Sequence, residues 1–108
     1  MLQAKEIQKK ISQIENEIGM AAKACLTDAA TSPQLRDSLT RLNKTSGLAR
    51  QAAQDNDQAK IVKMVDELEM LGDEVDRFCQ KDTHVTSNVR ETVGRVHRDL
   101  STLKRQLH

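Results

Sequence analysis

The chain has 108 residues, of which 37% are hydrophobic and 31% are charged, and its formal net charge at pH 7 is +1. A chain of this length forms one domain, and a net charge near zero gives no overall attraction to nucleic acid or to an acidic membrane. No apolar run approaches the roughly 20 residues of a membrane span, and the first twenty residues hold no signal-peptide core. Two cysteines are typical of a reducing compartment, so we expect a cytoplasmic protein.

Apolar residues recur at spacings of three and four along four stretches of the chain. In chain order, the stretches contain Ile7, Ile11, Ile14, Ile18, Ala21 and Cys25; Leu35, Leu39, Leu42, Ala49 and Ala53; Ile61, Met64, Leu68, Leu71, Val75 and Phe78; and Val85, Val89, Val93, Val96, Leu100, Leu103 and Leu107. Such spacings place side chains on one face of a helix. A single apolar face must pack against another element, so the pattern predicts helices packed on helices.

Short breaks between these stretches supply helix starts. Ser32 can cap a helix whose first residue is proline. Either Asn56 or Asp57 can cap the third helix, and either Asp82 or Thr83 can cap the fourth. We predict four helices, at about 2–29, 33–54, 58–80 and 84–107. Their matched lengths and short loops favour an all-α, antiparallel up-down-up-down four-helix bundle.

The second predicted helix has the poorest apolar face. The residues that weaken it are Ser46, Gly47, Ala49 and Ala53. Gly costs about 1 kcal/mol against Ala inside a helix, so a kink near Gly47 is an alternative to a continuous helix. Alanine buries less surface than leucine would. We therefore predict that residues 44–56 open faster than residues 61–78 and admit a partner's helix. The third helix is the most apolar, and Leu68 should be among the most buried residues.

The last two predicted helices carry net charges of opposite sign. Residues 57–80 carry seven acids and three bases, whereas residues 81–108 carry six bases and three acids. Helices of opposite sign attract when they pack side by side, although each exposed ion pair contributes only about 0–1 kcal/mol. The charge difference therefore supports a hairpin of these two helices.

Two charged groups are candidate docking patches. The acidic ridge contains Asp66, Glu69, Asp73 and Asp76, which we expect to face outward toward a basic partner. The basic patch contains Arg90, His97, Arg98, Lys104 and Arg105, which could bind phosphates or an acidic peptide. A solvated helix face is the plainer interpretation of both patches. Nucleic acid is disfavoured as a partner, because no aromatic side chains stand among the bases for stacking.

The cysteines, histidines and possible nucleophiles of the sequence form no catalytic or metal-binding motif. Cys25, Cys79 and His84 should come to the same end of the bundle, but they lack the tight spacing of a zinc site. We expect core thiols, with a disulfide as an alternative. The chain has no Gly-rich phosphate loop and no histidine beside a nucleophile, so we expect no enzyme activity, no metal and no cofactor. A phosphoacceptor role for His84 or His97 is a further alternative.

Several short runs resemble the vinculin/α-catenin family. They are Ile14-Glu15-Asn16, Ala21-Ala22, Asp28, Pro33, Arg36-Asp37-Ser38-Leu39, residues 57–65 and Lys104-Arg105-Gln106. In that family a helix with an alanine pair ends in a short Asp/Pro loop, and a long helix and a basic segment follow. The chain departs from the family in length, which suits a single bundle module. The resemblance implies a cytoskeletal adhesion adaptor that binds amphipathic helices of its partners.

We therefore expect a non-enzymatic helical protein–protein interaction module, whose partner is an amphipathic helix. One alternative is a self-associating structural bundle, in which two chains form a homodimer with a shared core. The second alternative is a phosphorelay-type signalling bundle that uses His84 or His97.

Overall fold

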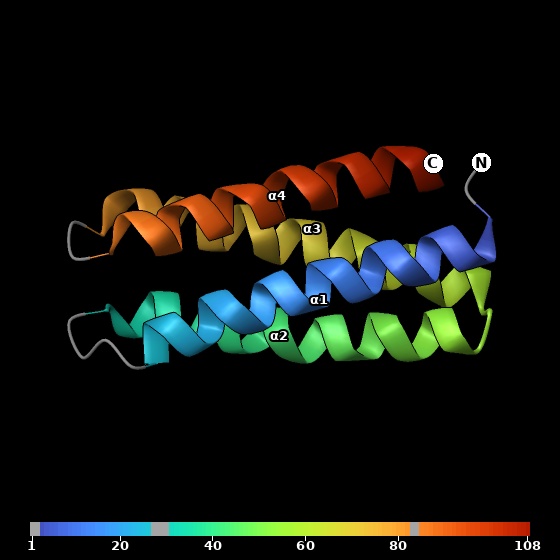
Figure 1. Cartoon of the computed structure of the whole chain (residues 1–108), viewed down its shortest axis with the longest axis horizontal. Helices are drawn as coiled ribbons and strands as arrows, with labels where there is room; N and C mark the ends of the chain where they lie inside the picture. Colours follow the sequence, from blue (N-terminus) through green and yellow to red (C-terminus); the bar gives the residue numbers. More distant parts are fainter. Residues whose placement is uncertain (1–2, 27–30, 83–84) are drawn as a thin grey trace.

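The computed structural model describes residues 3–26, 31–82 and 85–108, with the side chain of Leu26 excepted. It contains four helices: α1 (Ala4–Leu26), α2 (Pro33–Gln54), α3 (Gln58–Lys81) and α4 (Ser87–Leu107). The helices lie roughly along the long axis of a body of 40 × 20 × 18 Å (Figure 1). This arrangement confirms the all-α four-helix bundle. None of the described helices is long and apolar enough to cross a bilayer.

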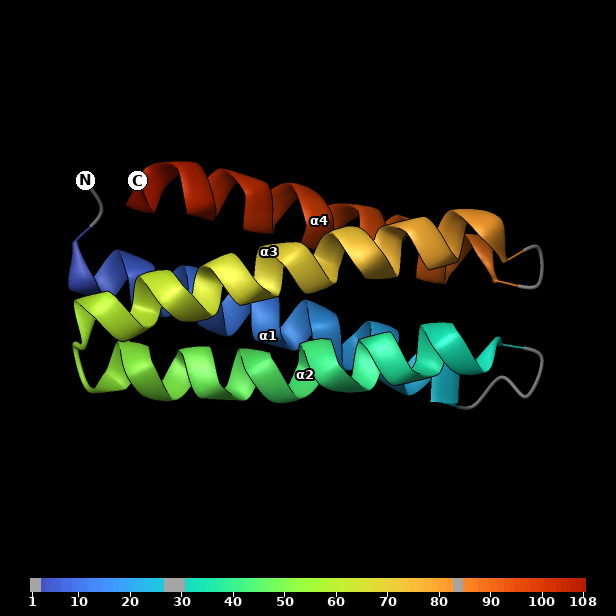
Figure 2. The ribbon, with the colours of Figure 1, turned by 180° about the vertical axis from the view of Figure 1, so that it is seen from behind.

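Each helix packs against its neighbours in the chain, and α1 and α4 also pack against each other. The start of α1 and the end of α4 lie at the same end of the bundle (Figures 1 and 2). The contact between α1 and α4 is the least extensive of the four. The bundle is therefore a ring of four interfaces in which the one that joins its first and last helices is the least extensive.

The starts of α2 and α3 match the sequence prediction. The Oγ of Ser32 accepts a hydrogen bond of 3.3 Å from the backbone N–H of Leu35. The Oδ1 of Asp57 accepts one of 3.2 Å from the backbone N–H of Lys60. Each bond satisfies an N–H that would otherwise have no partner within the helix. Asn56 has a φ of 55°, a left-handed conformation that asparagine adopts more readily than most residues, and it turns the chain between α2 and α3.

The start of α4 differs from the prediction. The helix begins at Ser87 rather than at residue 84, and its N-cap is Thr86 rather than Asp82 or Thr83. Asp82 makes hydrogen bonds to other parts of the bundle. Its backbone N–H donates to the carbonyl of Phe78 at the end of α3, and its carboxylate accepts from the N–H of Ser32 at 3.0 Å. The predicted ends of the first helix, at residues 2 and 29, lie outside the described residues.

The apolar positions of the sequence pattern form one continuous core. It contains isoleucines from α1, leucines from α2 and α4, and valines from α3 and α4. Leu68 is only 1% exposed, which confirms its predicted burial. Phe78, the single aromatic residue, packs against the core while partly buried. Among buried polar groups, Ser38 donates a hydrogen bond of 2.9 Å from α2 to Glu74 of α3, so its hydroxyl is satisfied.

The interior is filled by small and medium side chains, which lets the helices approach closely. The clearest example is Gly72 of α3, where an added Cβ would lie 3.0 Å from Cδ1 of Leu100 on α4. Leu100 is fully buried. The absence of a side chain at Gly72 therefore makes room for a leucine of the neighbouring helix.

Candidate functional site

Three residues of the acidic ridge on α3 pair with side chains of α4 or of its C-cap residue, and two of those side chains, His97 and Lys104, belong to the basic patch. Nε2 of His108 lies 3.0 Å from Oδ1 of Asp66. Nζ of Lys104 lies 3.6 Å from Oε2 of Glu69. His97 is paired with Asp73 by its Nε2. Asp66, Glu69 and Asp73 of the acidic ridge therefore each pair with a side chain from the α4 side, while the side chains of Asp66 and Asp73 stay 42% and 47% exposed.

The remaining members of the patches have separate surroundings. Asp76 accepts a hydrogen bond of 3.0 Å from Gln80 on its own helix. Arg90 donates a hydrogen bond of 2.6 Å to the backbone carbonyl of Asp82. Arg98 and Arg105 are exposed. The opposite charges of the third and fourth predicted helices thus meet in three pairs: His97 with Asp73, Lys104 with Glu69, and His108 with Asp66.

The candidate weak helix is continuous in the structure. α2 runs unbroken from Pro33 to Gln54, so the helix does not break near Gly47. Ser46, Ala49 and Ala53 are almost fully buried, and the hydroxyl of Ser46 donates to the carbonyl of Asn43 at 2.6 Å. These small residues allow α2 to pack closely between its neighbours. The faster opening of residues 44–56 stays a prediction that hydrogen exchange can test.

Polar contacts also tie this half of α2 to α1. Nε of Arg50 lies 3.0 Å from Oε1 of Glu15. The side-chain amide of Gln8 donates a hydrogen bond of 2.9 Å to the carbonyl of Ala53. Compared with this α1–α2 boundary, the α1–α4 boundary has fewer residue contacts.

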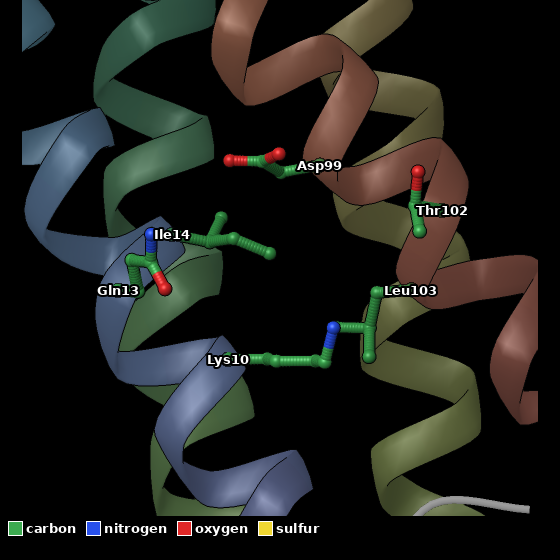
Figure 3. Close-up of a pocket in the computed structure, with 6 residues that line it drawn as sticks. All are labelled: Lys10, Gln13, Ile14, Asp99, Thr102 and Leu103. Carbon is green, nitrogen blue, oxygen red and sulfur yellow. The ribbon is translucent and has the colours of Figure 1, made fainter.

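A groove lies along that boundary (Figure 3). Its volume is about 190 Å³, and it is lined by Lys10, Gln13 and Ile14 from α1 and by Asp99, Thr102 and Leu103 from α4. Ile14 and Leu103 belong to the buried core and form the apolar part of the groove. The side chains of Ile14 and Asp99 point toward the opposite helix, and Lys10 extends across toward Leu103.

Two carboxyl groups meet at this boundary. Glu17 of α1 is half-buried, and its Oε2 atom is shielded from solvent with no hydrogen-bond partner among the described residues. Burial raises the pKa of Glu17, the neighbouring Asp99 carboxyl raises it further, and Arg95 lowers it in part. The α1–α4 boundary thus combines an apolar floor with an acidic pair that favours the uptake of a proton.

Cys25 and Cys79 are free thiols and both are buried. Burial raises the pKa of the Cys79 thiol, Arg90 opposes this effect, and Asp76 and Asp82 add to it. Among the described residues, no three His, Cys, Asp or Glu side chains gather as a set that could hold a metal ion. His84, one of the two candidate phosphoacceptors, lies outside the described residues. The other candidate, His97, is engaged with Asp73.

Comparison of the chain with protein-family models, curated proteins and solved structures finds no match. The resemblance to the vinculin/α-catenin family therefore stays a hypothesis drawn from the short runs in the sequence.

The sequence pattern singled out the apolar residues of the groove, Ile14 and Leu103, but neither its polar lining nor the neighbouring pair Glu17 and Asp99. Glu17 and Asp99 each precede a core residue, Ile18 and Leu100, and so lie at the edge of an apolar face. An up-down-up-down bundle makes its first and last helices neighbours. Acidic residues at the facing edges of those two helices were the signal that could have identified the pair.

Proposed function

We propose that this protein is a non-enzymatic interaction module that binds an amphipathic helix of a protein partner in the groove between α1 and α4. The observation that carries the proposal is the groove itself, about 190 Å³ in volume, along the least extensive interface of the bundle. Helix-in-groove recognition needs an apolar floor for the partner's apolar face and polar groups at the rim that fix its register. Ile14 and Leu103 supply the floor, and the rim carries side chains of both charges.

The charges at the rim define the chemistry of the partner. Lys10 lies one helical turn from Ile14, and Ile14 and Asp99 face each other across the groove (Figure 3). A complementary helix would place an acidic residue beside Lys10 and a basic residue beside Asp99. Those two residues would be three or four positions apart, because such positions are neighbours on one face of a helix. Apolar residues on the same face would contact Ile14 and Leu103.

The proposed cellular role and compartment are drawn from the sequence. The resemblance to the vinculin/α-catenin family supports the role of a cytoskeletal or cell-adhesion adaptor. Two free, buried thiols support a reducing compartment such as the cytoplasm. Both statements are part of the proposal.

A selection experiment with matched variants tests the groove. A displayed library of 18-residue amphipathic helices would be selected on the immobilised chain, and the enriched peptides would be titrated against wild type, Lys10→Glu and Lys9→Glu. Lys10 lines the groove, whereas Lys9 is exposed and is not among its lining residues. Peptides in the groove should lose at least tenfold in affinity on Lys10→Glu, a change of about 1.4 kcal/mol. Lys9→Glu should alter affinity by less than about twofold, as expected for a solvated charge.

Two results would contradict the proposal. One is the absence of enriched peptides, or enriched peptides that bind Lys10→Glu as tightly as they bind wild type. The other is a dimer detected by light scattering that Lys10→Glu dissociates, because the groove would then be occupied by a second copy of this chain. The second result would support the homodimer alternative.

A further inference from the structure

Two arginines of α4 border the groove on its outer side. Thr102 is exposed and lines the groove, and Arg98 and Arg105 lie one helical turn before it and one turn after it. Residues at such spacings are neighbours on one face of a helix. Both arginines are exposed. These two residues, called the rim arginines below, therefore present two cations along the α4 edge of the groove.

Neither rim arginine has an acidic neighbour on its own helix. The residues three or four positions away from them are Gly94, Arg95, Ser101, Thr102 and His108. In the part of the chain that the structure describes, neither of the two forms an ion pair with another helix. The positive charge of both is therefore left for a molecule outside the bundle.

The other cations of α4 have contacts within the bundle. His97 and Lys104 pair with carboxylates of α3, and Arg90 donates a hydrogen bond to a backbone carbonyl. Arg95 lies 3.6 Å from Glu91, one turn before it on the same helix. The rim arginines are thus distinguished from the rest of α4 both by their place beside the groove and by the lack of a counter-ion among the described residues.

We infer that the partner helix carries two acidic residues seven positions apart, on the flank that faces α4, and that these pair with Arg98 and Arg105. The inference rests on the proposed function, because it defines the chemistry of the helix in the same groove. Seven residues of a helix span roughly 10.5 Å, or two turns. Two helices that lie side by side share this repeat, so acids at that spacing match both arginines. The planar guanidinium group suits the contact because it can bind a carboxylate through two parallel hydrogen bonds.

The acidic flank is separate from the contacts inside the groove. Asp99 lines the groove, and on a helix of 3.6 residues per turn it lies on one side of Thr102 while the rim arginines lie on the other. The acids of the flank therefore avoid Asp99, which still faces a basic residue of the partner. With a further acid beside Lys10, the partner is acidic overall.

A paired peptide library tests the acidic flank. The 18-residue amphipathic helices would be built in two halves with the same apolar face, one with glutamate and one with glutamine at two flank positions seven apart. Both halves would be selected together on the full chain, and each enriched peptide would be titrated in its glutamate and its glutamine form. We expect the glutamate form to bind roughly fivefold more tightly at low ionic strength, as two exposed ion pairs allow. This preference should shrink as salt is added.

Substitutions assign the preference to the rim arginines. The double variant Arg98→Gln, Arg105→Gln should bind the two peptide forms within about twofold of each other, since exposed positions lose only their pairing. The matched control is Lys63→Gln, Arg77→Gln, which removes the same charge from exposed positions of α3. None of the described residues that line the groove comes from α3, so the control should keep the preference.

The inference is wrong if the two peptide forms bind the wild-type chain equally, a comparison that needs no variant. It is also wrong if the Arg98→Gln, Arg105→Gln variant keeps the preference, or if the control loses it to the same extent, because overall charge would then be the cause. In each of these cases, glutamine forms that bind wild type and are weakened by Lys10→Glu would leave the proposed function standing. The absence of any enriched peptide would overturn both.

Discussion

Replacement of Leu68 by alanine tests whether the face of α3 is held in the core as the structure shows. Leu68 is 1% exposed and lies midway along α3. Each buried methylene contributes about 0.8 kcal/mol of transfer free energy, and a residual cavity adds about 24 cal/mol per Å³. Leu68→Ala should therefore lower the free energy of unfolding by about 2–5 kcal/mol. The matched control is Met70→Ala on the same helix, because Met70 is 61% exposed and its truncation should change stability by less than about 0.5 kcal/mol.

Urea unfolding followed by far-ultraviolet circular dichroism is the suitable assay, because the chain has no Trp or Tyr to report by fluorescence. With a urea m-value of about 1.5 kcal/mol per M, the Leu68→Ala midpoint should fall by roughly 1–3 M. An unchanged midpoint for Leu68→Ala would refute the packing described for α3. Equal losses for Leu68→Ala and Met70→Ala would show that burial is not what distinguishes the two positions.

Two further predictions concern close packing and the thiols. Gly19→Ala should raise the unfolding free energy by about 0.5–1 kcal/mol through helix propensity, since nothing lies within 4 Å of its added Cβ. Gly72→Ala should give no gain or a loss, because its added Cβ would lie 3.0 Å from Cδ1 of Leu100. Equal gains for the two variants in urea unfolding would contradict this difference. Cys25 and Cys79 should react with iodoacetamide at pH 8 much more slowly in the native chain than in urea, because both thiols are buried and burial raises the pKa of Cys79. Alkylation would be monitored by intact mass. Rapid alkylation of the native chain would contradict the burial of the thiols.

Much of the fold could be predicted because apolar spacing determines which face of each helix is buried. Positions such as Ile18 and Leu68 lie in the core as the pattern requires. The caps of α2 and α3 were predictable from one polar residue before each helix. The start of α4 was not, because Asp82, Thr83 and Thr86 are all chemically suitable caps. The choice depends on a tertiary contact of Asp82 with Ser32, which local sequence does not contain.

The charged patches illustrate a different limit. Helical spacing predicts that residues three or four positions apart in each patch share a face of their helix. Their orientation depends on how far each helix is rotated about its axis, and a band of acids beside an apolar face can point toward a neighbour or toward solvent. The pairs Glu69–Lys104 and Asp66–His108 show that the rotation brings the bands together. The groove escaped prediction because it depends on how closely α1 and α4 approach.

The placement of the first and last helices has a mechanical consequence. The beginning of α1 and the end of α4 lie at one end of the body, so a tension applied to these two points pulls them directly apart. The load then falls on the contacts of α1 with α4 one after another, in an unzipping geometry, instead of on all of them at once in shear. At the far end, Asp82 joins the end of α3 to the start of α2 through its carboxylate and to Arg90 of α4 through its carbonyl. Separation that begins at the loaded end would therefore reach this junction last, after the groove between α1 and α4 has already opened.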